Sequence, residues 1–326
     1  MAGPEHADPA TLHIPVLLDE CLAMLAPAFT VEKPILIDCT LGMGGHTHAV
    51  LERFPNVTVI GIDRDPEAIS IASRRLNTFG SRFHAVHTTY DHVDEVAQEY
   101  GHDGKVEAVL MDLGVSSLQL DEEKRGFSYA VDAPLDMRMN PTDGPTAADL
   151  IAHMSAAELT RILRIYGEER FASRIARNIV TEREKTPILR TGQLADIVRR
   201  SIPAPARRTG GNPSKRTFQA LRIAVNDELR ILEHALPRAL SSIRIGGRLV
   251  VESYQSLEDR IVKDIFKRGA TDQAPPEMPV IPPHLQARLT LLTRGAQRAH
   301  TQEQEHNPRS ASVRLRGAQI IAPWKE

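Results

Sequence analysis

The sequence is poor in the features that would place it in several broad classes of protein. Its 326 residues include two cysteines, Cys21 and Cys39, which are too few for a disulfide framework and favour a reducing cytoplasm. No apolar run approaches the roughly 20 residues that cross a bilayer, and the polar first ten residues lack the apolar stretch of a signal peptide. The composition is otherwise that of a globular protein, with 41% hydrophobic residues. We therefore expect a cytoplasmic protein with no membrane partner.

Net charge is also scarce, but its distribution is uneven. The chain as a whole carries a formal charge of -2. Residues 1–160 have 10 basic and 25 acidic side chains, whereas residues 161–222 have 15 basic and 5 acidic ones. A basic segment of this kind is typical of a surface that binds a polyanion, and the alternative is a solvated helical face.

Short apolar runs that alternate with helical patterns predict a parallel β-sheet covered by helices on both faces. The runs that we expect to be strands lie at residues 35–40, 57–63, 83–87, 106–112 and 246–253. Residues 287–294 and 310–321 alternate in the manner of an antiparallel hairpin. The fold class expected is therefore α/β and Rossmann-like, a mostly parallel sheet with a C-terminal antiparallel hairpin.

A helical region interrupts this sheet pattern. Helices are predicted at residues 146–153, 155–166, 168–185, 191–202 and 214–235, and the basic segment falls among them. We interpret the region as an inserted subdomain. The expected organisation is a disordered leader at 1–11, a catalytic domain at 12–125 with 226–326, and a basic, RNA-facing insertion at 126–225.

The turn after the first strand lacks one glycine of a dinucleotide-binding fingerprint. Gly42, Gly44 and Gly45 are present, but the position of the third fingerprint glycine holds Thr47. Asp63, 21 residues after Gly42, ends the next strand, where a carboxylate can accept both hydroxyls of an adenosine ribose. S-adenosylmethionine has that ribose but no pyrophosphate, so it fits better than a dinucleotide. The alternative is a tight turn that binds no ligand.

Asp112 ends the fourth strand, at the edge of the sheet where substrates enter such folds. The residues that follow lack the acid or Asn, the two prolines and the aromatic ring that many amino-directed methyltransferases have here. The chain has only 14 aromatic residues, and Phe127 and Tyr129 are the first of them after Asp112 in the sequence. They are candidates to stack on a base, and equally candidates for the core.

No metal site is expected. His84 and His87 lie three residues apart on a predicted strand and so face opposite ways, and Cys39 is expected to pack in the core. A basic loop before the last predicted helix of the insertion is instead suited to phosphate contact, and its residues Arg207, Arg208, Lys215 and Arg216 are the predicted RNA-binding side chains.

The motifs together resemble a known family, the bacterial ribosomal RNA small-subunit methyltransferase H family, also called MraW or RsmH. The resemblance extends from His13 to Arg316. The matching segments are Gly42–His46, Ile62–Asp65, Leu113–Ser117, Arg125–Ser128, Pro134–Met139, Tyr166–Phe171 and Ser256–Arg260. At Tyr254-Gln255 the chain departs from other members, which have Phe-His there, so Gln255 is not assigned a catalytic role.

The resemblance implies a class I enzyme that methylates the exocyclic N4 of a cytidine in the decoding region of small-subunit (16S) ribosomal RNA, with S-adenosylmethionine as cofactor. The 30S particle is the expected partner, and a homodimer stays open. By position, the cofactor contacts of the family fall on Gly44, Gly45, His46, Asp63, Tyr90, Asp112 and Gln119. Asp112 is also the candidate catalytic residue, as the acceptor of a hydrogen bond from N4.

Two other classes of function stay open on the sequence. A non-catalytic assembly factor would bind RNA and use the cofactor fold only as a scaffold. A nicotinamide-dependent dehydrogenase is disfavoured by Thr47 at the position of the missing glycine.

Overall fold

The computed structural model describes residues 15–207, 212–275, 277–278 and 280–324, and the expected leader at 1–11 and Arg208 lie outside them. The chain forms two compact units, one of residues 1–114 with 230–326 and one of residues 115–229. None of the described helices is long and apolar enough to cross a membrane. The predicted domain limits at 125/126 and 225/226 fall 11 and 4 residues from the borders of these units.

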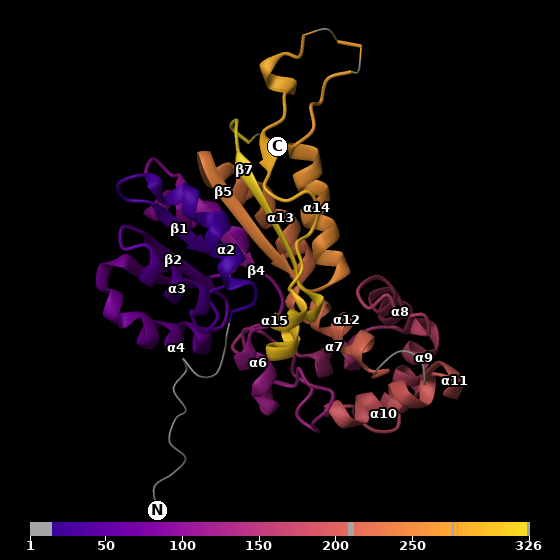
Figure 1. Ribbon diagram of the computed structural model, residues 1–326. Coiled ribbons are helices and arrows are strands. Elements are labelled where there is room, and N and C mark those ends of the chain that lie inside the picture. Colours follow the sequence, from indigo (N-terminus) through magenta and orange to yellow (C-terminus); the bar gives the residue numbers. More distant parts are fainter. Residues whose placement is uncertain (1–14, 208–211, 276, 279, 325–326) are drawn as a thin grey trace, which may run out of the picture. The chain divides into compact units, whose positions relative to one another are not determined.

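The first unit is built on a seven-stranded sheet with the order β3-β2-β1-β4-β5-β7-β6 (Figure 1). The strands are β1 (Ile35–Asp38), β2 (Thr58–Asp63), β3 (Phe83–His87), β4 (Val106–Asp112), β5 (Ile243–Ser253), β6 (Leu289–Leu291) and β7 (Arg314–Ile320). The first five strands are parallel, whereas β7 is antiparallel to both β5 and β6. This is the predicted α/β, Rossmann-like fold class: a mostly parallel sheet closed by an antiparallel hairpin.

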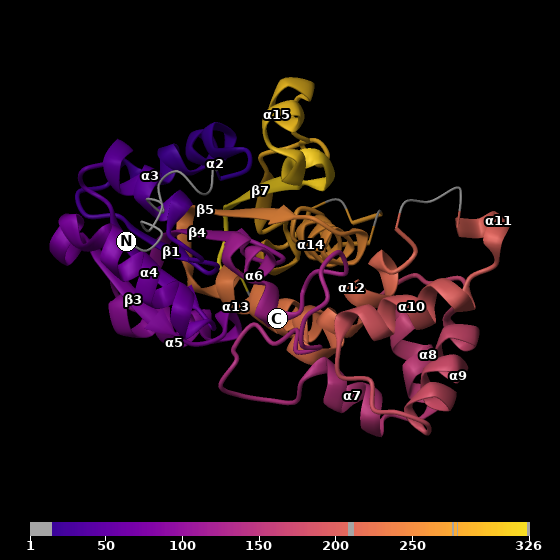
Figure 2. The same cartoon turned by 90° about the horizontal axis from the view of Figure 1, so that it is seen from below.

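Alternate residues of the central strands contribute to two separate hydrophobic cores. Ile35 and Ile37 of β1 face the core that includes α5, α13 and α14, and Leu36 faces the core that includes α2, α3 and α4. The helices are α2 (Leu18–Leu25), α3 (Gly45–Arg53), α4 (Pro66–Leu76), α5 (Val93–Tyr100), α13 (Glu228–Ser242), α14 (Ser256–Gly269) and α15 (Thr301–His306). Figure 2 shows α2 and α3 on one side of the strands and α5 and α13 on the other. Burial on both faces explains why these strands are continuous apolar runs.

The second unit is helical and has its own core, to which α7, α8, α9, α10 and α12 contribute. Its helices are α6 (Ser117–Asp121), α7 (Ala147–His153), α8 (Ala156–Ile165), α9 (Ala172–Arg183), α10 (Thr191–Ser201), α11 (Ala204–Arg207) and α12 (Lys215–Asn226). Thr146 and Ser155 form capping boxes at the starts of α7 and α8, as their sequence positions suggest. The last predicted helix, 214–235, is two helices instead of one, because Asp227 has a left-handed conformation with φ 52°.

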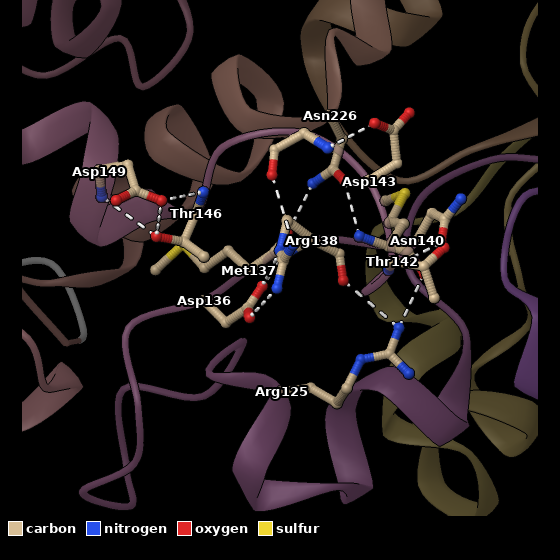
Figure 3. A network of polar contacts seen from close by, with 12 residues as sticks. Arg125, Asp136, Met137, Arg138, Asn140, Thr142, Asp143, Thr146, Asp149 and Asn226 are labelled. Carbon is tan, nitrogen blue, oxygen red and sulfur yellow. Dashed lines mark hydrogen bonds and ion pairs between the residues drawn. The ribbon is translucent and has the colours of Figure 1, made fainter.

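A network of polar contacts stabilises the segment 136–140 of this unit (Figure 3). The amide of Asn226 accepts a hydrogen bond from the backbone N–H of Met139 at 2.7 Å and donates one to the carbonyl of Met137 at 2.7 Å. The guanidinium of Arg125 donates to the carbonyl of Met139 at 2.8 Å. Met137 itself has a φ of 65°, which is unusual for a residue with a side chain. The network therefore holds a strained segment in place.

Candidate functional site

The glycine turn connects β1 to α3 at the carboxyl edge of the sheet. Gly44 is the residue before α3 and has φ 77°, a region that residues with a Cβ rarely adopt. A Cβ at this position would also lie 2.9 Å from Cδ1 of Leu76. Only glycine fits both conditions. The turn brings the N-terminus of α3 to the sheet edge, where the first N–H groups of a helix have no partner within the helix.

Asp63, at the end of β2, is fixed beside this turn by two backbone donors. Its Oδ2 accepts a hydrogen bond from the N–H of Gly42 at 2.7 Å, and its Oδ1 accepts one from the N–H of Asp65 at 2.9 Å. Burial raises the pKa of Asp63 to about 6, although both hydrogen bonds act in the opposite direction. Each oxygen keeps a second lone pair, so the carboxylate is held in a position from which it can accept hydroxyl groups.

Asp112 ends β4 and lies in register with Glu252 of β5. Its backbone N–H donates to Oγ1 of Thr40 at 2.7 Å, which connects the end of β4 to the residues that follow β1. The side chain is 23% exposed, whereas Glu252 is fully buried. Burial raises the pKa of the neighbouring Tyr254 hydroxyl well above its usual value, with further contributions from the charges of Asp112 and Glu252 and from hydrogen bonding to Asp112. Tyr254 therefore stays neutral and can position Asp112.

Next to Asp112 lies a buried polar cluster of Cys21 in α2, His46 in α3 and Glu252 in β5. We refer to it as the Cys21 cluster. Nε2 of His46 is 3.3 Å from Oε2 of Glu252, and Nδ1 of the same ring is 3.7 Å from Oδ2 of Asp112. One ligand atom from each of the three residues lies within 4.8 Å of the other two. No metal site was expected from the sequence, yet cysteine, histidine and glutamate are metal-binding residue types.

Burial shifts the titration of each member of the cluster toward its neutral form. It raises the pKa of Glu252 well above its usual value, with a further contribution from the charge of Asp112. It also raises the pKa of the Cys21 thiol and lowers the pKa of His46, although Asp38 opposes the shift of His46. Asp38 itself accepts a hydrogen bond from Oγ1 of Thr47 at 2.7 Å.

The predicted cofactor residues divide between the two units. Gly44, Gly45, His46, Asp63 and Asp112 all lie at the carboxyl ends of β1, β2 and β4, and Tyr90 follows β3 at the same edge. Gln119 lies in the helical unit, where its side chain accepts from the N–H of Ser116 at 3.1 Å in the capping box of α6. Their contacts with a cofactor stay predictions.

The two aromatic candidates near Asp112 in sequence contribute to the core of the helical unit. Phe127 is 8% exposed, and Tyr129 packs edge-to-face on Phe218 with ring centroids 5.7 Å apart. The interpretation of these two residues as core residues therefore has structural support.

Three residues of the site were not predicted from the sequence to belong to it: Cys21, Glu252 and Tyr254. One signal was available for Glu252, because it is an acid at the end of an apolar strand, as Asp112 is in β4. Cys21 gave no such signal, since it occupies an apolar position of an ordinary amphipathic helix.

The predicted RNA-binding residues lie around the start of α12. Lys215 and Arg216 are exposed at its first two positions, and Nη1 of Arg216 donates to the carbonyl of Glu168 at 3.1 Å. Arg207 ends α11, and Arg208 lies outside the described residues. Five further exposed arginines occupy α8, α9 and the turn between them, and no ion pair links them to an acid within the described part of the chain: Arg161, Arg164, Arg170, Arg174 and Arg177.

Comparison with known proteins gives consistent matches over nearly the whole chain. The model of the MraW methylase family matches residues 10–321. A protein of Beutenbergia cavernae named ribosomal RNA small subunit methyltransferase H is 57% identical, over 98% of this chain and 96% of its own length. A protein of the same name from a Nocardioides species is 55% identical, over 97% of both chains. A solved putative rRNA-methylase from Clostridium thermocellum is more distant, at 14% identity and a TM-score of 0.43, over 95% of this chain and all of that one.

Proposed function

The chain belongs to the MraW methylase family, and from this premise we propose that it methylates the exocyclic N4 of a cytidine in the decoding region of 16S ribosomal RNA. Its methyl donor is S-adenosylmethionine, which supplies an electrophilic methyl group. The names of the relatives support small-subunit RNA as the substrate. The observation that carries the proposal is the position of Asp63 and Asp112 at the ends of β2 and β4, on either side of the glycine turn after β1.

Asp63 and the glycine turn are the proposed site for the adenosine part of the cofactor. The carboxylate of Asp63, already oriented by the N–H groups of Gly42 and Asp65, accepts the two ribose hydroxyls. Because Gly44 has no side chain, the cofactor can approach the backbone of the turn closely. The N–H groups at the start of α3, at Gly45 and His46, donate to the cofactor.

Asp112 is the proposed catalytic residue. The lone pair of cytosine N4 is delocalised into the ring, so the amine is a poor nucleophile until one of its protons is hydrogen-bonded to a strong acceptor. Asp112 accepts that hydrogen bond and localises the lone pair of N4. The bond from N4 to the methyl carbon then forms as the carbon–sulfur bond of the donor breaks, a thioether leaves, and the proton that N4 loses passes to Asp112 and on to solvent. The enzyme holds N4 about 3–3.5 Å from that carbon, which converts a bimolecular encounter into a positioned one. Tyr254, which is hydrogen-bonded to Asp112, is a positioning residue for it.

The helical unit supplies the proposed RNA-binding surface. Lys215 and Arg216 contact phosphates, together with the exposed arginines of α8 and α9, for which no ion pair within 4.0 Å is found among the described residues. The unit as a whole has 18 basic and 15 acidic side chains, whereas its residues 161–222 have 15 basic and 5 acidic ones. The positive charge of the unit is therefore concentrated after residue 160. The target cytidine is unstacked when it enters the site. We propose the assembled 30S particle as the substrate.

Transfer of a labelled methyl group in vitro tests the proposal. The enzyme is incubated with 30S particles or with naked 16S RNA from cells that lack the modification, and the digested nucleosides are identified by mass spectrometry. We expect N4-methylcytidine from the particles, a loss of about 100-fold or more in rate for Asp112→Asn at saturating cofactor, and no loss for Asp103→Asn, whose side chain is 96% exposed. Full turnover by Asp112→Asn would refute its catalytic role. Another methylated nucleoside would refute the N4 assignment.

A further inference from the structure

We propose that the Cys21 cluster is a binding site for a divalent transition-metal ion of the zinc type, with Cys21, His46 and Glu252 as its three protein ligands. The three residues come from different parts of the fold, namely α2, α3 and the end of β5. Their ligand atoms lie within 4.8 Å of one another. A thiolate, an imidazole and a carboxylate are the ligand types that such ions bind in proteins.

The cluster contains buried polar atoms whose hydrogen-bonding capacity is unfilled. Both carboxylate oxygens of Glu252, and Nε2 of His46, are buried and accept no hydrogen bond from a nitrogen or oxygen donor of the described residues. The hydrogen bond between Glu252 and the Cys21 thiol is weak, so most of the hydrogen-bonding capacity of this buried carboxyl group is unfilled, which is costly. The unfilled atoms of both residues face each other, and Nε2 of His46 is 3.3 Å from Oε2 of Glu252. A cation between them would satisfy both groups.

The charges of the three ligands match a divalent ion. Cys21 as a thiolate and Glu252 as a carboxylate contribute two negative charges, and a neutral His46 contributes none. A doubly charged cation thus gives a neutral cluster in a part of the protein where Cys21 and Glu252 are 0% exposed. An unbalanced charge at this depth would be strongly disfavoured.

The geometry requires little rearrangement. Ligand atoms on one tetrahedral ion, at bond lengths of about 2.0–2.3 Å, are about 3.5 Å apart. The His46–Glu252 pair is already close to that separation, and Cys21 has to approach by at most about 1.3 Å. On the other side of the imidazole ring, Oδ2 of Asp112 lies 3.7 Å from Nδ1 of His46. His46 is also hydrogen-bonded to the backbone of Val16, and a hydrogen bond to a backbone carbonyl is typical of histidines that bind a metal through the other nitrogen.

Cobalt(II) tests the site directly, because a thiolate bound to Co²⁺ gives an intense near-ultraviolet charge-transfer absorption that oxygen and nitrogen ligands do not give. The full-length chain is purified under reducing conditions, freed of metal with a chelator and titrated with Co²⁺, and Zn²⁺ is then added as competitor. We expect the absorption to saturate at one Co²⁺ per chain and to disappear when Zn²⁺ displaces it. The readout is a spectrum, so its failure would leave the methyl-transfer proposal untouched.

Matched variants assign the absorption to the cluster. Cys21→Ser should abolish it, and Glu252→Gln should weaken Co²⁺ binding about tenfold or more. Cys39→Ser is the control, because Cys39 is the other buried cysteine and lies outside the cluster. Circular dichroism establishes that each variant is folded. If Cys21→Ser does not fold, the spectrum of the unchanged protein and the affinity of Glu252→Gln still decide the question. A folded protein that shows no charge-transfer band with Co²⁺ would overturn the proposal, and so would an equal loss in Cys39→Ser.

Discussion

Substitution of Asn226 by alanine should destabilise the helical unit far more than an ordinary surface change. The side chain is 2% exposed and is hydrogen-bonded to the N–H of Met139 and the carbonyl of Met137, on the segment shown in Figure 3. It also donates to the carbonyl of Arg222. Met137 and Met139 are 0% and 7% exposed, so water cannot readily replace the lost partners. The N–H and the carbonyl in the 136–140 segment would both lose this partner.

The magnitude follows from the cost of a buried polar group without a partner. Each such group costs about 1–3 kcal/mol, so the loss of two predicts a decrease of about 2–6 kcal/mol in the free energy of unfolding. A domain has only about 5–15 kcal/mol in total. Urea unfolding followed by far-ultraviolet circular dichroism measures the change, and hydrogen exchange with mass spectrometry should show the loss of protection within 136–140.

Asn178→Ala is the matched control for this prediction. Its side chain is half-buried and donates one hydrogen bond, to Oγ of Ser201 at 2.8 Å. The expected loss is about 1 kcal/mol. If Asn226→Ala and Asn178→Ala destabilise the protein equally, the inference that Asn226 holds the strained segment is wrong.

Three further predictions concern the turn, the cofactor site and the RNA surface. Gly44→Ala should lower the free energy of unfolding by about 1–2 kcal/mol because of the φ of 77°, and by about 1–3 kcal/mol more because of crowding against Leu76. Gly144→Ala has φ 76° with open space around it, so in a denaturant titration it should show only the first of these losses. Equal losses in the two variants would contradict the crowding. The pKa of Asp63 is raised to about 6, so the stability that this carboxyl contributes is present at low pH and is lost as the pH rises through 6. Binding of the ribose hydroxyls needs the ionised form of Asp63, so the affinity for the cofactor, measured by calorimetry, should fall about tenfold from pH 7.5 to pH 5. Asp63→Asn should bind the cofactor weakly at both pH values. If its affinity fell equally steeply, the pH dependence would belong to another group. The double variant Arg174→Gln and Arg177→Gln should weaken RNA binding and reduce the slope of log affinity against log salt concentration by about 2. Arg199 is paired with Asp196 at 3.0 Å, so Arg199→Gln should change this slope little. An unchanged slope in the double variant would show that Arg174 and Arg177 do not belong to the RNA-binding surface.

The strands of the sheet could be predicted from the sequence because burial on both faces imposes continuous apolar runs. The runs that end at Asp63 and Asp112 coincide with the ends of β2 and β4. Helix ends were less predictable. The single helix expected at 214–235 breaks at Asp227, and the helix expected from residue 168 begins at Ala172, after a left-handed Glu168 with φ 47°. Neither position holds the glycine or proline that usually marks such a break.

The site was predictable only where it follows the chain locally. The turn at Gly44 and the acid at Asp63 are read from one strand–turn–helix–strand segment. The Cys21 cluster depends on the pairing of β5 with β4 and on the packing of α2, and these bring together residues more than 200 positions apart. No local pattern encodes that proximity. The charge pattern needed the same correction, because the acidic residues before position 161 belong partly to the helical unit.

The most direct test of the account is the N4-methylcytidine content of small-subunit ribosomal RNA in a strain from which the gene is deleted. The RNA is digested and analysed by mass spectrometry after complementation with the unchanged protein, with Asp112→Asn or with Asp103→Asn. We predict that the modified nucleoside is absent from the deletion strain and from the Asp112→Asn strain, and that the unchanged protein and Asp103→Asn both restore it. N4-methylcytidine at an unchanged level in the deletion strain would contradict the proposed activity.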